Sequence, residues 1–218
     1  MSHDNNGVEA GGLAGLTRRF LGAWGSMSLL SSSINMSRHD PITLRPIRED
    51  DLDAVLRVQA ACYPPVMQEA ADVVRARIRA AGATSFVADS GGAVRAYVFA
   101  YRSGKGAVTP LDAPFEVQEA GDTLYIHDLS VAPDAAGQGL ARQLVERLLA
   151  LAGAQGLGHC ALVSVQDSRR FWERLGFRKA ACGDAAARQA LASYPPVALY
   201  MCRGVGRGTP HPGSSSLL

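Results

Sequence analysis

Residues 124–152 of this 218-residue chain, LYIHDLSVAPDAAGQGLARQLVERLLALA, are the stretch that decides the fold. The first part, Thr123 to Val131, is a β-rich apolar run and predicts a strand. A turn follows at Pro133 and Asp134 and continues through two glycines. Beyond the glycines, leucines recur at helical spacing with Arg, Gln and Glu between them, which predicts an amphipathic helix. The stretch therefore reads as a strand, a glycine turn and a helix.

The turn has the physical properties of a diphosphate site. The first N–H groups of a helix have no intrahelical partner and carry partial positive charge, and small residues let a phosphate approach them closely. The small residues here are Ala135, Ala136, Gly137, Gly139 and Ala141. Neither familiar nucleotide fingerprint fits, because the chain has no Gly-x-x-x-x-Gly-Lys-Ser/Thr and lacks the third glycine of the dinucleotide pattern. From this stretch alone, an ordinary turn before a core helix is an equally good interpretation.

Two motifs resemble those of the GNAT superfamily of N-acetyltransferases. Residues 128–141, DLSVAPDAAGQGLA, resemble its acyl-CoA-binding motif, usually written Arg/Gln-x-x-Gly-x-Gly/Ala. Residues 171–177, FWERLGF, resemble the Phe-Tyr-Glu-Arg-x-Gly-Phe element that follows it in that family. The likeness covers roughly residues 41–203. It is closest to the arylalkylamine (serotonin) N-acetyltransferase type, through the strand at 126–131 and the segment Cys62-Tyr63-Pro64.

The resemblance implies an α/β GNAT fold, with a mixed central sheet of about six to seven strands flanked by about four helices. It also implies acetyl-CoA as co-substrate. The implied cofactor contacts lie on the strand end, the turn, the first helical residues and the second motif: Leu129, Ser130, Val131, Gly137, Gln138, Gly139, Leu140, Ala141, Arg142 and Trp172. Backbone groups of Leu129 and Val131 would pair with the pantetheine arm as an added strand. Turn N–H groups would hold the pyrophosphate, with Gln138, Arg142 or Arg169 adding contacts.

His127 and Tyr125 are the candidate catalytic residues. A primary amine with a pKa near ~10 is mostly protonated at neutral pH, so its attack requires proton removal, a task suited to histidine. In the arylalkylamine type a histidine at this position is linked to that step, and Tyr125 stands where the family has a second histidine. Alternation along the strand predicts that Tyr125, His127, Leu129 and Val131 share one face, with Asp128 on the other unless the strand bulges. The alternative is a core histidine that only hydrogen-bonds.

Two positions depart from the family pattern. Trp172 replaces a tyrosine that often lies near the departing sulfur, and an indole N–H is no practical proton donor. Trp172 could instead stack on the cofactor arm, and Tyr194 or Tyr200 could supply the hydroxyl. Ala136 stands where the motif begins with Arg or Gln, which predicts weaker binding of acetyl-CoA.

The residues predict an acetyl-CoA-dependent N-acetyltransferase that transfers the acetyl group to a primary amine by direct attack. The expected acceptor is a small molecule, arylalkylamine-like or polyamine-like. A protein or peptide amine is the alternative within this class, and a non-catalytic acyl-CoA-binding module is the alternative outside it. Acceptor choice is assigned to residues 63–67 and to the loop 102–121. The second half of this loop is acidic, so it is either a pocket wall that attracts a cation or a solvated loop.

Periodicity predicts the remaining elements. These are a strand at 42–47, a helix with acids 49–51 in its first turn that stops at Tyr63-Pro64-Pro65, a helix at 68–81, a hairpin of 84–89 and 93–101, a buried strand at 160–165, a short helix closed by Gly176 and a last strand at 197–202. Asp167 or Ser168 is expected to cap the short helix. Residues 180–196 are left unassigned.

Composition excludes several classes of protein. Hydrophobic residues make up 47% and charged residues 19% of the chain, as in soluble globular domains. A net charge of +2 predicts no nucleic-acid partner. No apolar run approaches the ~18 residues of a membrane span, so no membrane partner is expected. The four widely spaced cysteines predict reduced thiols, a cytoplasmic location and no metal site, and an apolar setting makes Cys160 an inert thiol.

The termini differ in composition from the middle of the chain. Residues 1–40 are rich in Gly, Ser and Asn and predict a disordered extension, with Met36 as an alternative start of translation. Residues 41–203 form the predicted domain, and 204–218 a flexible tail. The sequence is compatible with a monomer or a homodimer.

Overall fold

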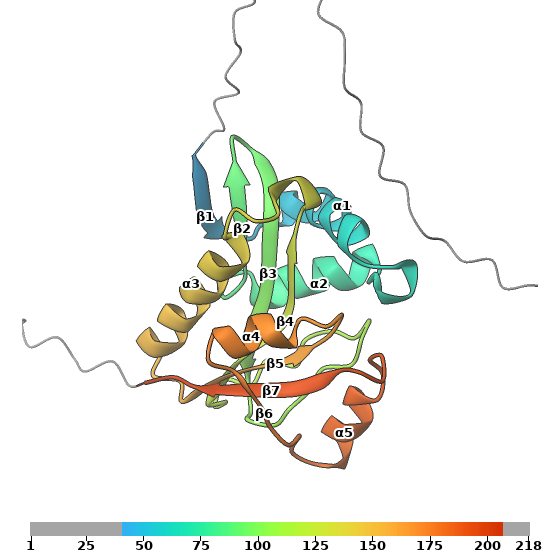
Figure 1. Cartoon of the computed structure of the whole chain (residues 1–218), viewed down its shortest axis with the longest axis vertical. Helices are drawn as coiled ribbons and strands as arrows, with labels where there is room; N and C mark the ends of the chain where they lie inside the picture. Colours follow the sequence, from blue (N-terminus) through green and yellow to red (C-terminus); the bar gives the residue numbers. More distant parts are fainter. Residues whose placement is uncertain (1–40, 207–218) are drawn as a thin grey trace, which may run out of the picture. The chain divides into compact units, whose positions relative to one another are not determined.

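A computed structural model describes residues 41–206 (Figure 1). The expectations for residues 1–40, including a start at Met36, and for 207–218 lie outside the described residues. Seven strands form one sheet in this part of the chain: β1 (Ile42–Pro46), β2 (Phe86–Ser90), β3 (Ala93–Ser103), β4 (Thr123–Val131), β5 (His159–Ser164), β6 (Arg178–Lys179) and β7 (Leu199–Gly204). The five α-helices are α1 (Leu52–Cys62), α2 (Ala71–Ala81), α3 (Leu140–Ala154), α4 (Arg169–Arg174) and α5 (Ala185–Leu191). The predicted α/β class and the strand number are confirmed.

One pair of neighbouring strands in the sheet is parallel. The strand order is β1-β2-β3-β4-β5-β7-β6, and β4 and β5 are the parallel pair. Their pairing runs from Thr123 opposite His159 to Ile126 opposite Leu162 and stops there. Both strands continue beyond this point, β4 to Val131 and β5 to Ser164. The two strands are therefore unpaired with each other over their last residues.

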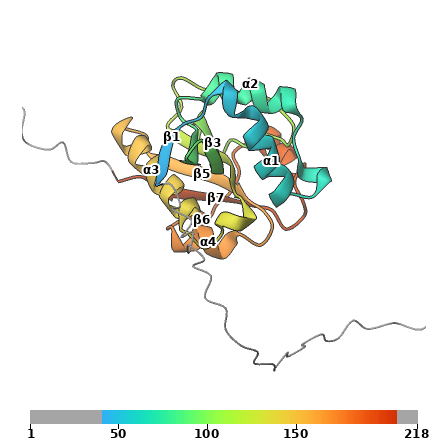
Figure 2. The same ribbon diagram turned by 90° about the horizontal axis from the view of Figure 1, so that it is seen from above.

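Helices cover both faces of the sheet, and each face has its own core (Figure 2). On one face the apolar stripe of α3, including Leu144 and Leu148, packs with Ile126 and with Trp172 of α4. On the other face α1 and α2 pack against Tyr97, Phe99 and Tyr125 among others. The helical spacing of the apolar residues thus buries one side of each helix and leaves its polar side to solvent.

β4 contains a bulge at His127. Asp128 lies opposite Phe99 and Ile126 lies opposite Ala100, so His127 is an extra residue in β4 without a partner in β3. An extra residue shifts the alternation of side chains by one position. His127 and Asp128 consequently both belong to the α1/α2 face, whereas Leu129 packs against the α3 core.

The prediction that Tyr125, His127, Leu129 and Val131 share one face is therefore wrong. Tyr125 belongs to the core on the α1/α2 face, while Leu129 and Val131 pack against the α3 core. Strict alternation fails here because the bulge lies between the two halves of the strand.

Several boundaries also differ from the predicted ones. The segment before α2 forms a separate 3-10 turn, Pro65–Met67, which Pro64 precedes and Pro65 begins, and α2 begins only at Ala71. The unassigned segment contains α5, whose first turn is capped by the Asp184 carboxylate accepting from Ala187 N–H at 2.8 Å. The last strand begins at Leu199 and extends to Gly204.

The two ends of α4 differ in how well they were predicted. Ser168 occupies the N-cap position, but its side chain makes no capping hydrogen bond; its hydroxyl accepts from Trp172 Nε1 at 3.2 Å. The predicted cap is therefore wrong. At the other end Gly176 has a φ of +87°, the left-handed conformation expected of a glycine that ends a helix.

Within residues 41–206, no helix is both long enough and apolar enough to cross a membrane. All four cysteines carry free thiols, as predicted, and burial raises the pKa of Cys160 to about 12.

Candidate active site

The end of the β4–β5 pairing opens a cleft, here called the strand cleft, with about 660 Å³ of space when its open mouth is included. Its lining includes Ile126, Leu129 and Val131 of β4, Leu162 and Val163 of β5, Ala141 of α3 and Trp172 of α4. Most of these side chains are apolar. The strand cleft is therefore suited to a thin, largely apolar arm that lies along β4.

The free edge of β4 offers backbone groups to the strand cleft. Ala132 N–H donates to Arg95 O at 2.8 Å, so at this position the backbone points toward the β3 side. Because backbone groups alternate along a strand, those of Val131 and Leu129 point away from β3. The Cys62 thiol, 3.2 Å from Val131 O, occupies one of them. The backbone groups of Leu129 and Val131 therefore face away from β3, and their pairing with an extended ligand stays a prediction.

The glycine turn lies between β4 and α3. Gly137 and Gly139 have φ values of +78° and +77°, and Gly139 is the N-cap of α3. A Cβ added at Gly137 would meet no atom within 4 Å, so the backbone conformation, rather than lack of space, requires glycine there. The first intrahelical bond of α3 is donated by Gln143 N–H to Gly139 O, which leaves the preceding N–H groups without helical partners. A pyrophosphate fits this turn.

The predicted phosphate-binding residues Gln138, Arg142 and Arg169 are exposed. Arg142 pairs with Glu146 at 2.7 Å and Arg169 pairs with Glu173 at 2.7 Å, each one helical turn away. Gln138 Nε2 lies 3.5 Å from Asp134 O. Exposed pairs of this kind contribute little to stability, so either arginine is free to reorient toward an anion.

A second cavity, here called the side cavity, lies on the α1/α2 side of β4 and has about 340 Å³ of space when its open mouth is included. Its lining comes from five stretches of the chain: Gln59, Tyr63, Met67 and Glu69, then Leu111, then His127 and Asp128, then Val163 and Val165, and finally Tyr194. Five residues line both this cavity and the strand cleft: Tyr63, His127, Asp128, Val163 and Val165. The two spaces therefore meet at the bulge of β4.

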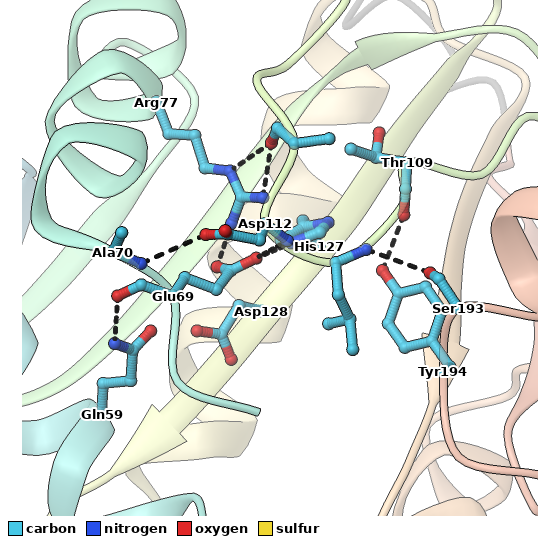
Figure 3. A network of polar contacts seen from close by, with 12 residues as sticks. Gln59, Glu69, Ala70, Arg77, Thr109, Asp112, His127, Asp128, Ser193 and Tyr194 are labelled. Carbon is cyan, nitrogen blue, oxygen red and sulfur yellow. Dashed lines mark hydrogen bonds and ion pairs between the residues drawn. The ribbon is translucent and has the colours of Figure 1, made fainter. Parts of the chain in front are cut away.

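His127 contacts a buried carboxylate, which a buried guanidinium engages in turn (Figure 3). Its Nε2 lies 3.2 Å from Glu69 Oε1, and Glu69 Oε2 accepts from Arg77 Nη1 of α2. Arg77 has no exposed surface, and Glu69 is buried as well. Burial by itself would raise the pKa of Glu69, but the His127 hydrogen bond and the Arg77 charge outweigh it and lower the pKa to about 2. Glu69 is thus an ionised, acceptor-only group.

The charge of Glu69 determines which ring nitrogen of His127 carries the proton. An ionised carboxylate can only accept, so Nε2 donates to Glu69 and, in the neutral ring, Nδ1 keeps the lone pair. Nδ1 is buried and has no hydrogen-bond partner among the described residues. A buried acceptor without a partner costs about 1–3 kcal/mol, so Nδ1 gains from any donor that reaches it. The arrangement can accept a proton.

The long loop between β3 and β4 packs against His127. The ring of Phe115 contacts His127 edge-to-face with centroids 5.2 Å apart, and Leu111 lines the side cavity. The acidic residues of the loop do not line this cavity: Asp112 accepts from Ala70 N–H, Glu116 lines a separate cavity, and Glu119 is exposed. The expectation of an acidic, cation-attracting loop wall is therefore wrong, because the loop turns apolar side chains toward the site.

Asp128 supplies the other carboxylate at the junction. Its oxygens accept from Tyr63 Oη at 2.6 Å and from Tyr97 Oη at 2.5 Å. Burial raises the pKa of Asp128, although these two hydroxyls oppose the shift. In the described residues no Lys or Arg side chain pairs with this carboxylate. Asp128 is thus a polar acceptor at the junction without a Lys or Arg partner among the described residues.

The other predicted site residues take different positions. Tyr125 is buried beside His127, but its hydroxyl has no partner in the described part of the chain and it lines neither space. Trp172 lines the strand cleft while packing on Phe177 in the core. Tyr194 lines the side cavity, with its hydroxyl donating to Thr109 O at 2.7 Å, and Tyr200 lies outside both spaces.

Sequence reasoning missed Glu69 and Arg77. Glu69 precedes α2 in the chain and lies 58 residues from His127, and no motif marks either residue. One signal was available. Arg77 lies next to Ile78 in the apolar stripe of α2, which predicts a buried arginine, and a buried arginine requires an acidic partner. Among residues 41–206 no group of three or more His, Cys, Asp or Glu side chains is suited to a metal ion.

Residues 52–177 match the profile of the acetyltransferase (GNAT) family. The chain belongs to this family. The predicted GNAT fold is thereby confirmed, and this GNAT protein is an acyltransferase with acetyl-CoA as its co-substrate. No curated protein matches it.

Solved structures similar to this GNAT protein share its fold at low sequence identity. The loading GNATL domain of CurA from Lyngbya majuscula has a TM-score of 0.66 at 13% identity, over 76% of this chain and 98% of that one. The GphF GNAT-like decarboxylase in complex with isobutyryl-CoA has a TM-score of 0.62 at 18% identity, over 75% and 99%. The ribosomal-protein-S18-alanine N-acetyltransferase from Escherichia coli has a TM-score of 0.56 at 17% identity, over 76% and 94%.

Proposed function

We propose that this enzyme acetylates a small primary amine by direct attack of the amine on the thioester, with His127 as the general base. The observation that carries the proposal is the meeting of the strand cleft and the side cavity at His127 and Asp128. An acyl group in one space and an amine in the other would face each other across the bulge. Such positioning is a major source of rate in group transfer.

The side cavity supports a small cationic acceptor. Met67, Leu111 and Val163 give the cavity apolar walls, which suit a carbon skeleton. The charge of Glu69 is offset by Arg77, whereas Asp128 has no protein cation beside it in the described residues. Asp128 is therefore our candidate for the group that binds the ammonium before His127 removes its proton.

The strand cleft and the glycine turn support the acetyl-CoA contacts. We assign the pantetheine to the backbone of Leu129 and Val131, with Ser130 between them, and the pyrophosphate to the N–H groups from Gly137 to Arg142. Trp172 is assigned to the wall of the strand cleft. This assignment keeps the contacts expected from the sequence but attributes them chiefly to the backbone.

Tyr63 is our candidate for the hydroxyl near the departing thiolate. Tyr63 is the one tyrosine among the described residues that lines the strand cleft, whereas Tyr194 and Tyr200 do not. Burial and Asp128 raise the pKa of Tyr63 well above its usual value, so the hydroxyl stays protonated. We therefore keep Tyr125 outside the reaction and replace it with Tyr63 in the proposed proton pathway.

Two other functions remain as outcomes of the test. A peptide amine is the alternative acceptor, favoured by the fold likeness to an enzyme named for a ribosomal protein. A non-catalytic acyl-CoA-binding module is the alternative class, favoured by Ala136 and Trp172. The arylalkylamine likeness rests on the sequence motifs alone, as do the cytoplasmic location and the choice between monomer and homodimer.

The test measures thiol release from acetyl-CoA with arylalkylamines, polyamines, aminoglycosides and short peptides as acceptors. Wild type is compared with His127→Ala and with His159→Ala as the matched control. His159 is also a strand histidine near an acid, with Nδ1 3.5 Å from Asp122 Oδ2, but it lines neither space.

We expect turnover with a small amine, a loss of about 10²–10⁴-fold in kcat for His127→Ala and near-normal turnover for His159→Ala. Turnover with peptides alone would transfer the assignment to the peptide alternative. No turnover with any amine, together with a raised Tm in acetyl-CoA, would favour the binding module.

A further inference from the structure

A short part of the β3–β4 loop is fastened above His127 from two sides. We call residues 109–113 the roof segment (Figure 3). On one side Tyr194 Oη donates to Thr109 O at 2.7 Å, and Leu111 N–H donates to Ser193 Oγ at 3.2 Å. On the other side Arg77 donates to Ala113 O through Nε at 3.1 Å and Nη2 at 2.6 Å. These four hydrogen bonds fix the position of the roof segment beside the side cavity. Leu111 of this segment lines the cavity.

The backbone of the roof segment is strained at its centre. Asp112 has a φ of +56°, a left-handed conformation that few residues other than glycine adopt. Such a conformation persists only where surrounding contacts determine it. For Asp112 those contacts are its carboxylate, which accepts from Ala70 N–H at 3.2 Å, and its own N–H, which donates to Glu69 Oε1 at 3.2 Å.

Glu69 Oε1 thus has two partners with different roles. It accepts from Asp112 N–H of the roof segment and from Nε2 of His127, both at 3.2 Å. The other oxygen, Oε2, is engaged by Arg77, which also holds Ala113 O. The backbone of Glu69 is itself fixed, because Gln59 Nε2 donates to its carbonyl at 3.0 Å. The carboxylate of Glu69 therefore fixes both the position of the roof segment and the orientation of the His127 ring.

We propose that Glu69 is a positioning residue that couples the roof segment to His127. The inference rests on the proposed function, since it gives that base its orientation and its tautomer. An acceptor that fits beneath Leu111 leaves both hydrogen bonds of Oε1 intact. An acceptor that lifts the roof segment pulls Asp112 N–H from Glu69 and loosens the ring of His127. The fit of the acceptor in the side cavity thereby determines whether the ring of His127 is oriented to accept a proton.

The test uses the whole chain without any amine and reads two properties of Glu69→Ala. The first is the protonated ring nitrogen of His127, observed by ¹⁵N NMR of histidine-labelled protein, with the ring of His159 as internal reference. The second is amide hydrogen exchange of the roof segment. Glu116→Ala is the matched control, because Glu116 is a loop carboxylate that lines only the separate cavity.

We expect a proton on Nε2 in wild type, a mixture of tautomers in Glu69→Ala, and exchange at Asp112 that is at least about tenfold faster, which corresponds to about 1.4 kcal/mol. Glu116→Ala should change neither property. A folded Glu69→Ala that keeps the Nε2 proton, or that keeps wild-type exchange at Asp112, would overturn the coupling.

A second variant covers the case in which Glu69→Ala does not fold. Glu69→Met combined with Arg77→Met removes both partners of the buried pair, so no unpaired charge stays inside the protein. In that protein the ring nitrogen alone is decisive: tautomer mixing supports the role of Glu69, and a retained Nε2 proton contradicts it. Failure of every amine to react with wild type would refute the proposed function and leave these two readouts unaffected.

Discussion

The strand cleft and the side cavity meet at His127, but they are built from different parts of the sequence. Apart from Tyr63, the strand cleft is lined by two stretches, 126–141 and 162–172. The side cavity takes its lining from five separate stretches between Gln59 and Tyr194. The first space relies on backbone groups and small or apolar residues, and the second relies on buried charged side chains. Local sequence therefore describes the cofactor side of the site far better than the acceptor side.

The largest expected effect concerns the buried charges of the acceptor side. Arg77→Met leaves Glu69 and Ala113 O without their partner, and breaking a buried pair in this way costs about 3–5 kcal/mol. Arg79→Met on the same helix is the matched control, since its pair with Glu49 is more than half exposed on both sides, at 63% and 52%. That change should cost at most about 1 kcal/mol. Urea unfolding of the two variants measures the difference, and equal losses would contradict a special role for Arg77.

The same side should be sensitive to acid. Because the pKa of Glu69 is lowered to about 2 in the folded protein, its ionised form stabilises the fold above the unfolded-state pKa of ~4.3. This contribution, about 3 kcal/mol, should be lost as the pH falls from about 5 toward 2. Glu69→Gln has no charge to lose at this position. Its unfolding free energy should therefore fall less than that of wild type between about pH 5 and pH 2, and parallel falls would refute this explanation.

On the cofactor side, the turn should respond through backbone conformation. Gly139→Val places a β-branched residue at a φ of +77°, which costs about 1–3 kcal/mol. We expect the Kd for acetyl-CoA to rise about 10–100-fold, since 1.4 kcal/mol is tenfold. Calorimetric titration measures it. Gly204→Val in β7, where an added Cβ meets nothing within 4 Å, is the control and should leave the Kd unchanged. An unchanged Kd in Gly139→Val would remove the turn from the binding site.

Asp128→Asn tests whether Asp128 serves the acceptor side or the cofactor side of the site. The amide keeps an oxygen to accept from Tyr63 or Tyr97 but loses the charge that would attract an ammonium. We expect the KM for the amine to rise about tenfold, or 1.4 kcal/mol, with the acetyl-CoA affinity unchanged. Steady-state kinetics with both substrates varied provides the measurement. A change in acetyl-CoA affinity alone would assign Asp128 to the cofactor side.

The smallest effect is expected at Trp172. Its indole N–H is engaged by Ser168 at 3.2 Å and its ring packs on Phe177, so its role in the strand cleft is that of a wall. Trp172→Tyr should leave kcat within about twofold of wild type or raise it, because a hydroxyl is added near the leaving sulfur. A large fall in kcat with unchanged acetyl-CoA affinity would show that the indole takes part in the reaction.

The accuracy of the sequence-based predictions follows the same division. The strand, glycine turn and helix were predicted, because their periodicity, glycines and leucines lie within one stretch. Alternation placed His127 correctly on the face of Tyr125, but it placed Asp128 on the opposite face unless the strand bulges, and no residue in β4 marks the bulge. The acidic loop wall was wrong, since composition does not say which side chains of a loop turn inward. Glu69, Tyr97 and Arg77 were missed, because their roles exist only once α2 and β3 pack beside β4.

The sequence by itself determined the α/β class, the GNAT motifs and the position of His127 in a strand before a glycine turn. These depend on contacts within a few residues, whose spacing is visible in the chain. The tertiary structure alone decided that His127 and Asp128 share a face, that Glu69 holds Nε2 and that the roof segment closes the side cavity. The physical reason is distance along the chain: Glu69 and His127 are 58 residues apart, and folding is what brings Glu69 Oε1 within 3.2 Å of His127 Nε2.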